Sequence, residues 1–257
     1  MAAIGEATPV TGKTNNKWTR LYLDTVDLSG DTNQIGSWGL SFDTNDLAGY
    51  ASGLHYYQLG HAQHIFKGYQ AVINNTALTG AHTELNAQEE YIASYLIGVN
   101  AVPEVGSAAW LSSMEQLTYN VQSGSDASLI NVDLEKAVTD ADHVIPFGVA
   151  LAAGQALTAN VANAGVDNLV ATTNGFVAHL HVTVSDGGSW VFGIETSSDD
   201  GDGDAYANVA TFTAIGDILE AERIDVAGAV ARYIRLNAER TGGTCTATIT
   251  IARGIDL

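Results

Sequence analysis

Apolar and polar positions alternate along most of the second half of the chain. The clearest run spans residues 176–184, where every second residue is apolar or small, with Asn-Gly before it and Asp-Gly-Gly after it. Shorter runs of the same kind occupy 190–195, 210–214, 223–226, 233–237 and 246–252. Period-two runs separated by turn residues predict short antiparallel strands, each with one buried face.

The two last runs flank the turn Thr-Gly-Gly-Thr at 241–244, which predicts an antiparallel hairpin. Its apolar positions predict four residues of a sandwich core: Ile234, Leu236, Ile249 and Ile251. Thr248 is expected on the opposite, solvent-facing side. In the 176–184 run, His179 and His181 alternate with the apolar positions, so they are expected at the surface.

The first half gives weaker patterns. Strands are predicted near residues 18–23, 35–42, 62–73, 129–134 and 145–150. Spacings of three and four residues before Gly98 predict a helix over 83–97 covering a sheet or barrel. The residues in this pattern are Leu85, Gln88 or Glu89, Ile92, Tyr95 and Leu96. The segment 109–122 fits either a helix or a strand, and a short helix leading into a strand is favoured.

Together these elements predict a mainly β protein in two domains. Residues 1–160 are expected to begin with a polar arm at 1–16 and to form a β-sandwich or barrel with one packed α-helix. Residues 161–257 are expected to form an antiparallel β-sandwich of jelly-roll or immunoglobulin-like type. The boundary is placed in the Ala-, Asn- and Gly-rich segment 151–168.

Charge narrows the possible functions. The chain has 10 basic and 29 acidic residues, a net charge of −19 spread over its whole length. This argues against binding nucleic acid through phosphates, and favours either a high-salt environment or a surface that repels DNA. No stretch resembles a membrane span or a secretory signal, so a protein made in the cytoplasm is expected, with no membrane partner.

One acidic segment could bind a cation. Asp200, Asp202 and Asp204 alternate with small residues, as the ligands of a calcium loop do. However, Ala205 and Thr211 stand where an EF-hand would have glycine and glutamate. A solvated loop of an acidic protein is therefore the preferred interpretation, and a Ca²⁺ or other cation site at these three aspartates the alternative.

No enzyme is expected, and no cofactor. The sequence contains no phosphate-binding loop, dinucleotide fingerprint or nucleophile elbow, and its single cysteine, Cys245, lies in a predicted strand. Three close histidines, His55, His61 and His64, lack the spacing of a zinc site.

The order of the predicted elements along the chain, and their pattern of apolar and polar residues, resemble those of the major tail (tube) proteins of long-tailed phages and archaeal tailed viruses. The resemblance lies in a polar arm, the segment LYLDTVDLSG at 21–30, paired strands and a helix before Gly98. The second half resembles carbohydrate-module-like sandwiches appended to virion proteins. The similar residues there are Ser197–Asp200, Phe212, Glu222, Arg223, 231–236 and 241–243.

The resemblance implies a virion structural protein, a tail tube subunit that forms rings, commonly hexameric, stacked into a conduit for DNA. Its partners would be copies of itself and other virion proteins, with DNA passing as cargo that does not stick to an acidic wall. The unusual acidity would suit a halophilic host. The alternative is a capsid decoration, spike or glycan-binding module in which Trp190, Phe192 and Tyr206 stack on sugars.

Overall fold

The computed structural model of the chain describes residues 18–46, 57–77, 80–87, 89–99, 101–123, 128–137, 147–216 and 219–254. Within these ranges the side chains of 42–46 and 57–62 are not described. Strands dominate the described part, in two antiparallel sheets with one short helix. The predicted mainly β fold is confirmed.

The strands divide between a twelve-stranded and a five-stranded sheet. The larger contains β1 (Thr19–Leu23), β2 (Val26–Asp27), β3 (Thr32–Gln34), β4 (Ser37–Asp46), β5 (Tyr57–Val72), β6 (Glu90–Ile97), β7 (Ala108–Ser123), β8 (Ser128–Ala137), β9 (Phe147–Leu157), β12 (Phe176–Ser185), β15 (Ala221–Val226) and β17 (Cys245–Arg253). The smaller contains β10 (Val161–Ala162), β11 (Val166–Asp167), β13 (Trp190–Ser197), β14 (Ala207–Thr211) and β16 (Tyr233–Arg240).

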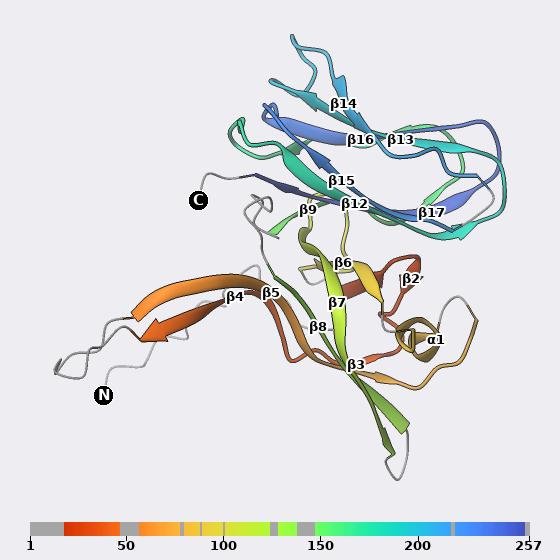
Figure 1. Cartoon of the computed structure of the whole chain (residues 1–257). Coiled ribbons are helices and arrows are strands. Elements are labelled where there is room, and N and C mark those ends of the chain that lie inside the picture. Colours follow the sequence, from red (N-terminus) through yellow and green to blue (C-terminus); the bar gives the residue numbers. More distant parts are fainter. Residues whose placement is uncertain are drawn as a thin grey trace, which may run out of the picture.

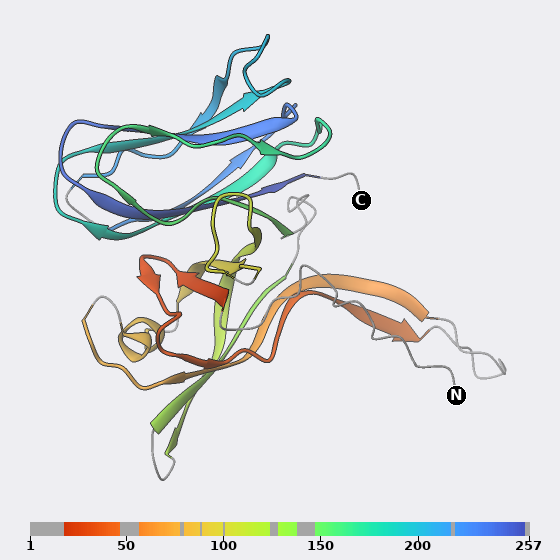
Figure 2. The same ribbon diagram turned by 180° about the vertical axis from the view of Figure 1, so that it is seen from behind.

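The larger sheet folds back on itself, so three layers are stacked (Figures 1 and 2). The smaller sheet, centred on β13 and β16, forms the outer layer. Strands β15, β12, β17 and β9 form the middle layer, and β7, β6 and β1 the next, with β9 pairing to β7 at the fold. The middle layer is therefore covered on both faces.

The sandwich core lies between the outer and middle layers. Its fully buried residues include the four predicted from the alternation, Ile234, Leu236, Ile249 and Ile251. The hairpin prediction, by contrast, is wrong: β16 pairs with β13, and β17 pairs with β12 and β9. The chain crosses from one layer to the other, and facing strands of a sandwich share one core just as hairpin strands do.

The crossover between β16 and β17 depends on glycine. Gly243 has a φ of 67°, and a Cβ placed on it would lie 1.5 Å from the carbonyl oxygen of Gly187. No side chain fits between backbones this close, so the Gly-Gly pair is required by contact between two loops.

The predicted helix over 83–97 is also wrong. Helix α1 spans only Ala81–Leu85, and β6 follows at Glu90–Ile97. Strand β6 is buried on both faces: Tyr91 and Tyr95 pack in a second core below, while Ser94 and Leu96 face the middle layer. A strand buried on both faces does not alternate between apolar and polar residues. The spacing of the apolar residues in 83–97 therefore also fitted a helix. The short helix favoured at the start of the segment 109–122 is wrong as well, because the whole segment lies in strand β7 and residues 109–114 are buried on both faces.

The division into domains at residue 160 stays a prediction. Strand β9 lies before that boundary, yet it pairs with β17 and places Leu151, Ala152 and Leu157 in the sandwich core. Any separable sandwich must therefore include β9. Among the described residues, no helix is long and apolar enough to cross a bilayer.

Candidate functional site

The acidic loop between β13 and β14 uses its carboxylates to hold its own backbone. The Asp199 carboxylate accepts the amides of Gly203 at 2.6 Å and Asp204 at 3.0 Å, and the Asp204 amide bond is the largest factor lowering the pKa of Asp199. Asp204 accepts the Ser198 amide at 2.9 Å. Asp200 accepts the hydroxyl of Tyr206 at 2.6 Å.

These contacts bear on the candidate cation site at Asp200, Asp202 and Asp204. Two of the three carboxylates already have hydrogen-bond donors from the chain. In the described part of the chain, no three His, Cys, Asp or Glu side chains are grouped so that they could hold a metal ion. Cation binding here stays a prediction from the sequence.

The aromatic residues proposed for sugar stacking are not equally accessible. Trp190 and Phe192 are fully buried in the sandwich core, with ring centroids 6.1 Å apart and planes at 13°. Tyr206 is partly exposed, but the guanidinium of Arg235 lies 3.8 Å from its ring centroid. Of the three residues proposed for sugar stacking, only Tyr206 could contact a ligand, and only with the ring face that Arg235 does not cover.

The early histidines do not form a cluster that the structure describes. His55 lies outside the described residues, as does the side chain of His61. His64 is buried, and its Nδ1 lies 2.5 Å from the Ser112 hydroxyl.

A buried polar cluster lies between the middle layer and β6, where the histidines expected at the surface are found. His179 and His181 are both 0% exposed, as are Ser94, Thr248 and Thr250. The surface prediction is wrong because β6 and its neighbours cover the second face of β12. We call these five residues the junction cluster.

Hydrogen-bond partners fix the protons of His181. Its Nδ1 lies 2.7 Å from the Asp24 carbonyl oxygen, and its Nε2 lies 2.8 Å from the Ser94 hydroxyl. A carbonyl only accepts, so Nδ1 carries the proton and Nε2 accepts from Ser94. The Thr250 hydroxyl, 2.9 Å away, then donates to Ser94 Oγ. Burial lowers the pKa of His181 to about 4, which keeps this ring neutral.

His179 is held less completely. Its Nδ1 donates to the Ala93 carbonyl at 3.2 Å, while its buried Nε2 has no partner among the described residues. Burial is the main cause that lowers its pKa well below the ordinary value, and His181 and Arg223 add to it. Two neutral histidines thus occupy the junction.

A serine hydroxyl on a histidine Nε2 is the geometry of an activated nucleophile. Here Ser94 and His181 are both completely buried, so no substrate could reach them. The group on Nδ1 is the backbone carbonyl of Asp24, whose carboxylate accepts the Ile92 amide at 2.8 Å instead. The arrangement can join two layers, but it cannot perform acyl transfer in this form.

Asp24 is the turn residue whose carbonyl oxygen accepts the hydrogen bond from His181 Nδ1. Its role was not predicted from the sequence. Its φ of 46° places the carbonyl toward β12, and burial raises its carboxyl pKa to about 6. Asp is among the few residues that accept this conformation readily, so Asp-Thr after an apolar run was a usable signal. Nothing in the sequence pattern linked Ser94 to β12, because that contact joins residues 85 or more positions apart.

A second candidate region is the ribbon formed by β4 and β5, which extends away from the layers (Figures 1 and 2). Strand β8 pairs with β5 only as far as Gln63, so residues 57–62 pair only with β4 among the described strands. The outer edge of β4 has no partner strand in the described part of the chain.

Comparison with known proteins adds little to this geometry. No family model and no curated protein matches the sequence. Among solved structures, the chain matches the Dit protein of phage SPP1, described as a paradigm of the hub adsorption apparatus in phages that infect Gram-positive bacteria. The match covers 91% of this chain and 98% of Dit at 10% identity, with a TM-score of 0.28. A score this low establishes no shared fold.

Proposed function

We propose that the chain is a structural subunit of a virus tail that associates with copies of itself into rings. The ribbon of β4 and β5 is the observation that supports this most. A two-stranded ribbon is marginally stable alone in water, and an unpaired strand edge is a template for another chain. The ribbon is therefore best explained as an element completed by a neighbouring subunit.

The first six residues of β4 favour such pairing. Residues 37–42 include no charged residue and no proline, the two usual protections of an exposed edge, whereas the end of the strand carries Asp43 and Asp46. The edge strand β15 provides the contrast within the same sheet, because Glu222, Arg223 and Asp225 place three charges in its six residues. Residues 37–42 of β4 therefore lack the charges that protect the edge of β15.

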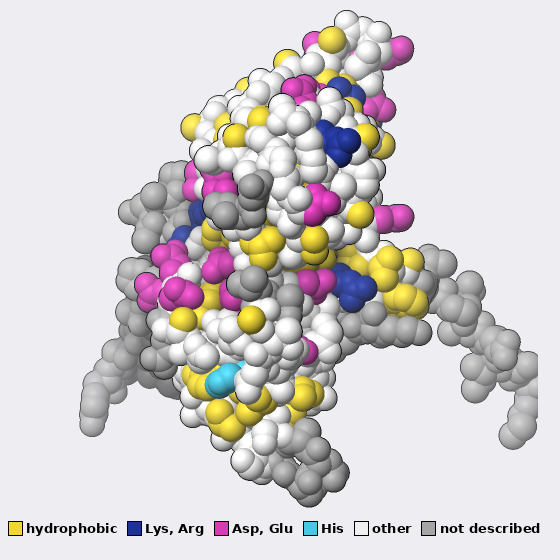
Figure 3. Space-filling model, turned by 90° about the vertical axis from the view of Figure 1, so that its right-hand side faces the viewer, with side chains coloured by type: hydrophobic (Ala, Val, Ile, Leu, Met, Phe, Trp, Pro, Cys, Tyr) yellow, Lys and Arg dark blue, Asp and Glu magenta, His cyan; other side chains and the backbone are white. Residues whose placement is uncertain are grey.

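The charge supports the finer proposal of a tail tube. Figure 3 shows Asp and Glu side chains on the upper part and around the middle of one face, with fewer Lys and Arg side chains between them. With 29 acidic and 10 basic residues, a ring of copies would present a wall that repels phosphates, so DNA could pass without binding. Stacked hexameric rings, a virion location and other virion proteins as partners belong to this proposal, which requires neither enzymatic activity nor a cofactor.

The glycan-binding alternative is less favoured. It would rest on Tyr206 alone, since Trp190 and Phe192 are buried in the core. Retention of the protein on a glycan array would be the finding that revives it.

Assembly of the full-length protein tests the proposal. Sedimentation velocity and negative-stain imaging at about 1 M salt, where the Debye length is roughly 3 Å, should show closed rings of the wild type. Ser37→Lys with Ser41→Lys puts two cations on β4 and should reduce the protein to monomers. Asn208→Lys with Thr211→Lys makes the same change on β14, a strand of only five residues, and should leave rings intact. A wild type that stays monomeric at high concentration in high salt would refute the proposal.

A further inference from the structure

A strained loop at one end of the sandwich exposes two aliphatic side chains. Leu169 has a φ of 67°, a conformation that a bulky residue rarely adopts. Its side chain is 76% exposed and that of Val170 is 64% exposed, the largest values among the exposed large apolar residues that the structure describes. We call residues 166–170, which carry this pair, the apical loop.

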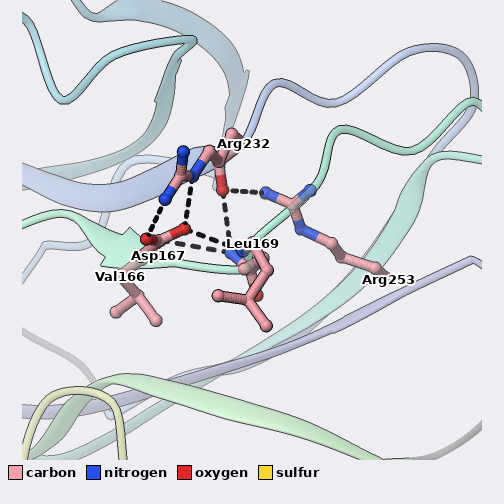
Figure 4. A network of polar contacts seen from close by, with 6 residues as sticks. Val166, Asp167, Leu169, Arg232 and Arg253 are labelled. Atoms are coloured by element: carbon pink, nitrogen blue, oxygen red, sulfur yellow. Dashed lines mark hydrogen bonds and ion pairs between the residues drawn. The ribbon is translucent and has the colours of Figure 1, made fainter.

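Charged side chains hold the apical loop in place (Figure 4). The Asp167 carboxylate accepts the Leu169 amide at 2.7 Å, and it accepts two bonds from the Arg232 guanidinium at 2.7 and 2.5 Å. Arg253 donates to the Val170 carbonyl at 3.2 Å and to the Arg232 carbonyl at 3.1 Å. The strained backbone is thus fixed by Asp167 of β11, Arg253 of β17 and Arg232, which directly precedes β16.

Neither core uses the exposed pair. Strained residues persist where the surroundings over-determine them, and they concentrate at functional positions. A preformed loop that presents apolar side chains loses little conformational freedom on binding, which is the property of an anchor in a protein interface.

A groove that could receive this anchor lies at the opposite end of strands β12 and β17. Its apolar lining includes Val102, Pro103 and Ala153, and Val102 is itself 53% exposed. Arg20 and Asp27 supply one charge of each sign at the groove. We call this site the waist groove.

The register of β12 and β17 places the two features apart. Phe176 pairs with Arg253, which holds the apical loop, whereas Ser185 pairs with Cys245 near the groove residues Thr183 and Thr246. Seven residues of strand separate Phe176 from Thr183, roughly 23 Å at about 3.3 Å per residue. An anchor and a receiving groove on opposite sides of one subunit make a head-to-tail interface, which closes into a ring when the rotation permits.

Charge indicates that the occupant of the groove is a second copy of the chain. Repulsion between copies of a protein with net charge −19 is least where local charges cancel. The apical loop is held by one acidic and two basic side chains, and the waist groove has one of each sign. A basic partner would instead be drawn to the acidic surfaces.

We propose that the Leu169–Val170 pair of one subunit inserts into the waist groove of its neighbour and so forms the lateral contact of the ring. The inference rests on the proposed function, because it names a contact within that ring. It adds a contact independent of the β4 edge.

Two substitutions separate an anchor from a merely structural loop. Leu169→Gly relieves the backbone strain and removes the exposed side chain, so the melting temperature of the full-length monomer should stay equal or rise. The same change should raise the dissociation constant of the ring at least tenfold. Val191→Gly removes an exposed aliphatic side chain from β13 and should leave the dissociation constant unchanged. Rings of Leu169→Gly that dissociate like wild-type rings would overturn the proposal.

Cross-linking identifies the receiving site. A full-length Leu169→Cys variant mixed with a Val102→Cys variant should give a disulfide-linked dimer under mild oxidation, since the native Cys245 is buried. Leu169→Cys mixed with Val209→Cys, an exposed position on β14, should not. Wild-type rings without the Leu169–Val102 cross-link would refute this interface and leave the proposed function in place. Absence of wild-type rings would instead refute the proposed function.

Discussion

The two faces of the β12–β17–β9 layer are equally buried but chemically different. Leu180 and Ile249 on one face are 0% exposed in an apolar sandwich core. His179, His181, Thr248 and Thr250 on the opposite face are also 0% exposed, but they meet polar partners on β6 and on β9. In this layer, alternation along a strand therefore distinguishes an apolar buried face from a polar buried face. It does not distinguish buried residues from exposed ones.

The difference has an energetic meaning. An apolar face is stabilised in proportion to the area it removes from water, without regard to direction. A buried polar face contributes little net free energy, but an incorrect register leaves donors and acceptors unpaired. The sandwich core stabilises the fold, while the junction cluster specifies how the third layer is positioned on the middle one.

The largest test of this contrast removes the third layer. A fragment of residues 147–257 keeps β9 and both sandwich layers, and it exposes a face lined by histidine and threonine that tolerates water. It should melt cooperatively in calorimetry. A fragment of residues 161–257 loses β9, and with it Leu151 and Leu157 from the core, so it should show no cooperative transition. Cooperative melting of the shorter fragment would mean that the boundary predicted near residue 160 is correct.

This contrast also explains how far the sequence could predict the fold. Phe176 and Leu180 alternate with residues of different polarity, so β12 and its apolar face were predictable. The same alternation misplaced His179 at the surface, because a single strand does not show what covers its second face. Strand β6 gave a helical pattern because both of its faces are buried. Neither the Ser94 contact nor the crossover after β16 could be predicted, since both depend on long-range pairing.

The apolar face can be tested by a single truncation. Ile249→Ala deletes a fully buried side chain between the two sandwich layers, and should lower the free energy of unfolding by about 2–5 kcal/mol. Val191→Ala, on the outer face of β13, should change it by less than about 0.5 kcal/mol. Urea denaturation measures both. A small effect at Ile249 would show that the core repacks around the cavity.

The junction cluster should respond to pH where the apolar face does not. His179 is buried with its pKa far below 6.5, so below about pH 6.5 the unfolded chain binds a proton that the folded chain does not. Its contribution therefore weakens as pH falls, by up to about 1.4 kcal/mol per pH unit. The unfolding free energy of wild type minus that of His179→Leu should decrease accordingly between pH 6.5 and 5.

The difference between the two proteins isolates His179. Asp24 and Glu84 have pKa values raised to about 6 and about 7 by burial, so they stabilise the folded chain as pH falls through this range. Together with His181 they are present in both proteins, and their contributions cancel in the subtraction. A difference that stays constant with pH would show that His179 is protonated, or accessible to water, in the folded protein.

The smallest expected effect is at Thr248, the direct neighbour of Ile249. Its hydroxyl accepts the Gly154 amide at 2.8 Å, and Thr248→Val removes this acceptor while keeping the volume of the side chain. Tyr22 also forms a side-chain hydrogen bond with Thr248. The free energy of unfolding should fall by about 0.5–1.5 kcal/mol for each hydrogen bond lost. Gly154 is exposed, so water can replace the lost acceptor and keep the effect near the lower limit. If Thr248→Val cost as much as Ile249→Ala in the same urea experiment, the polar face would stabilise the fold as strongly as the apolar one. The junction would then be a second core, and the excised 147–257 fragment should fail to fold as well.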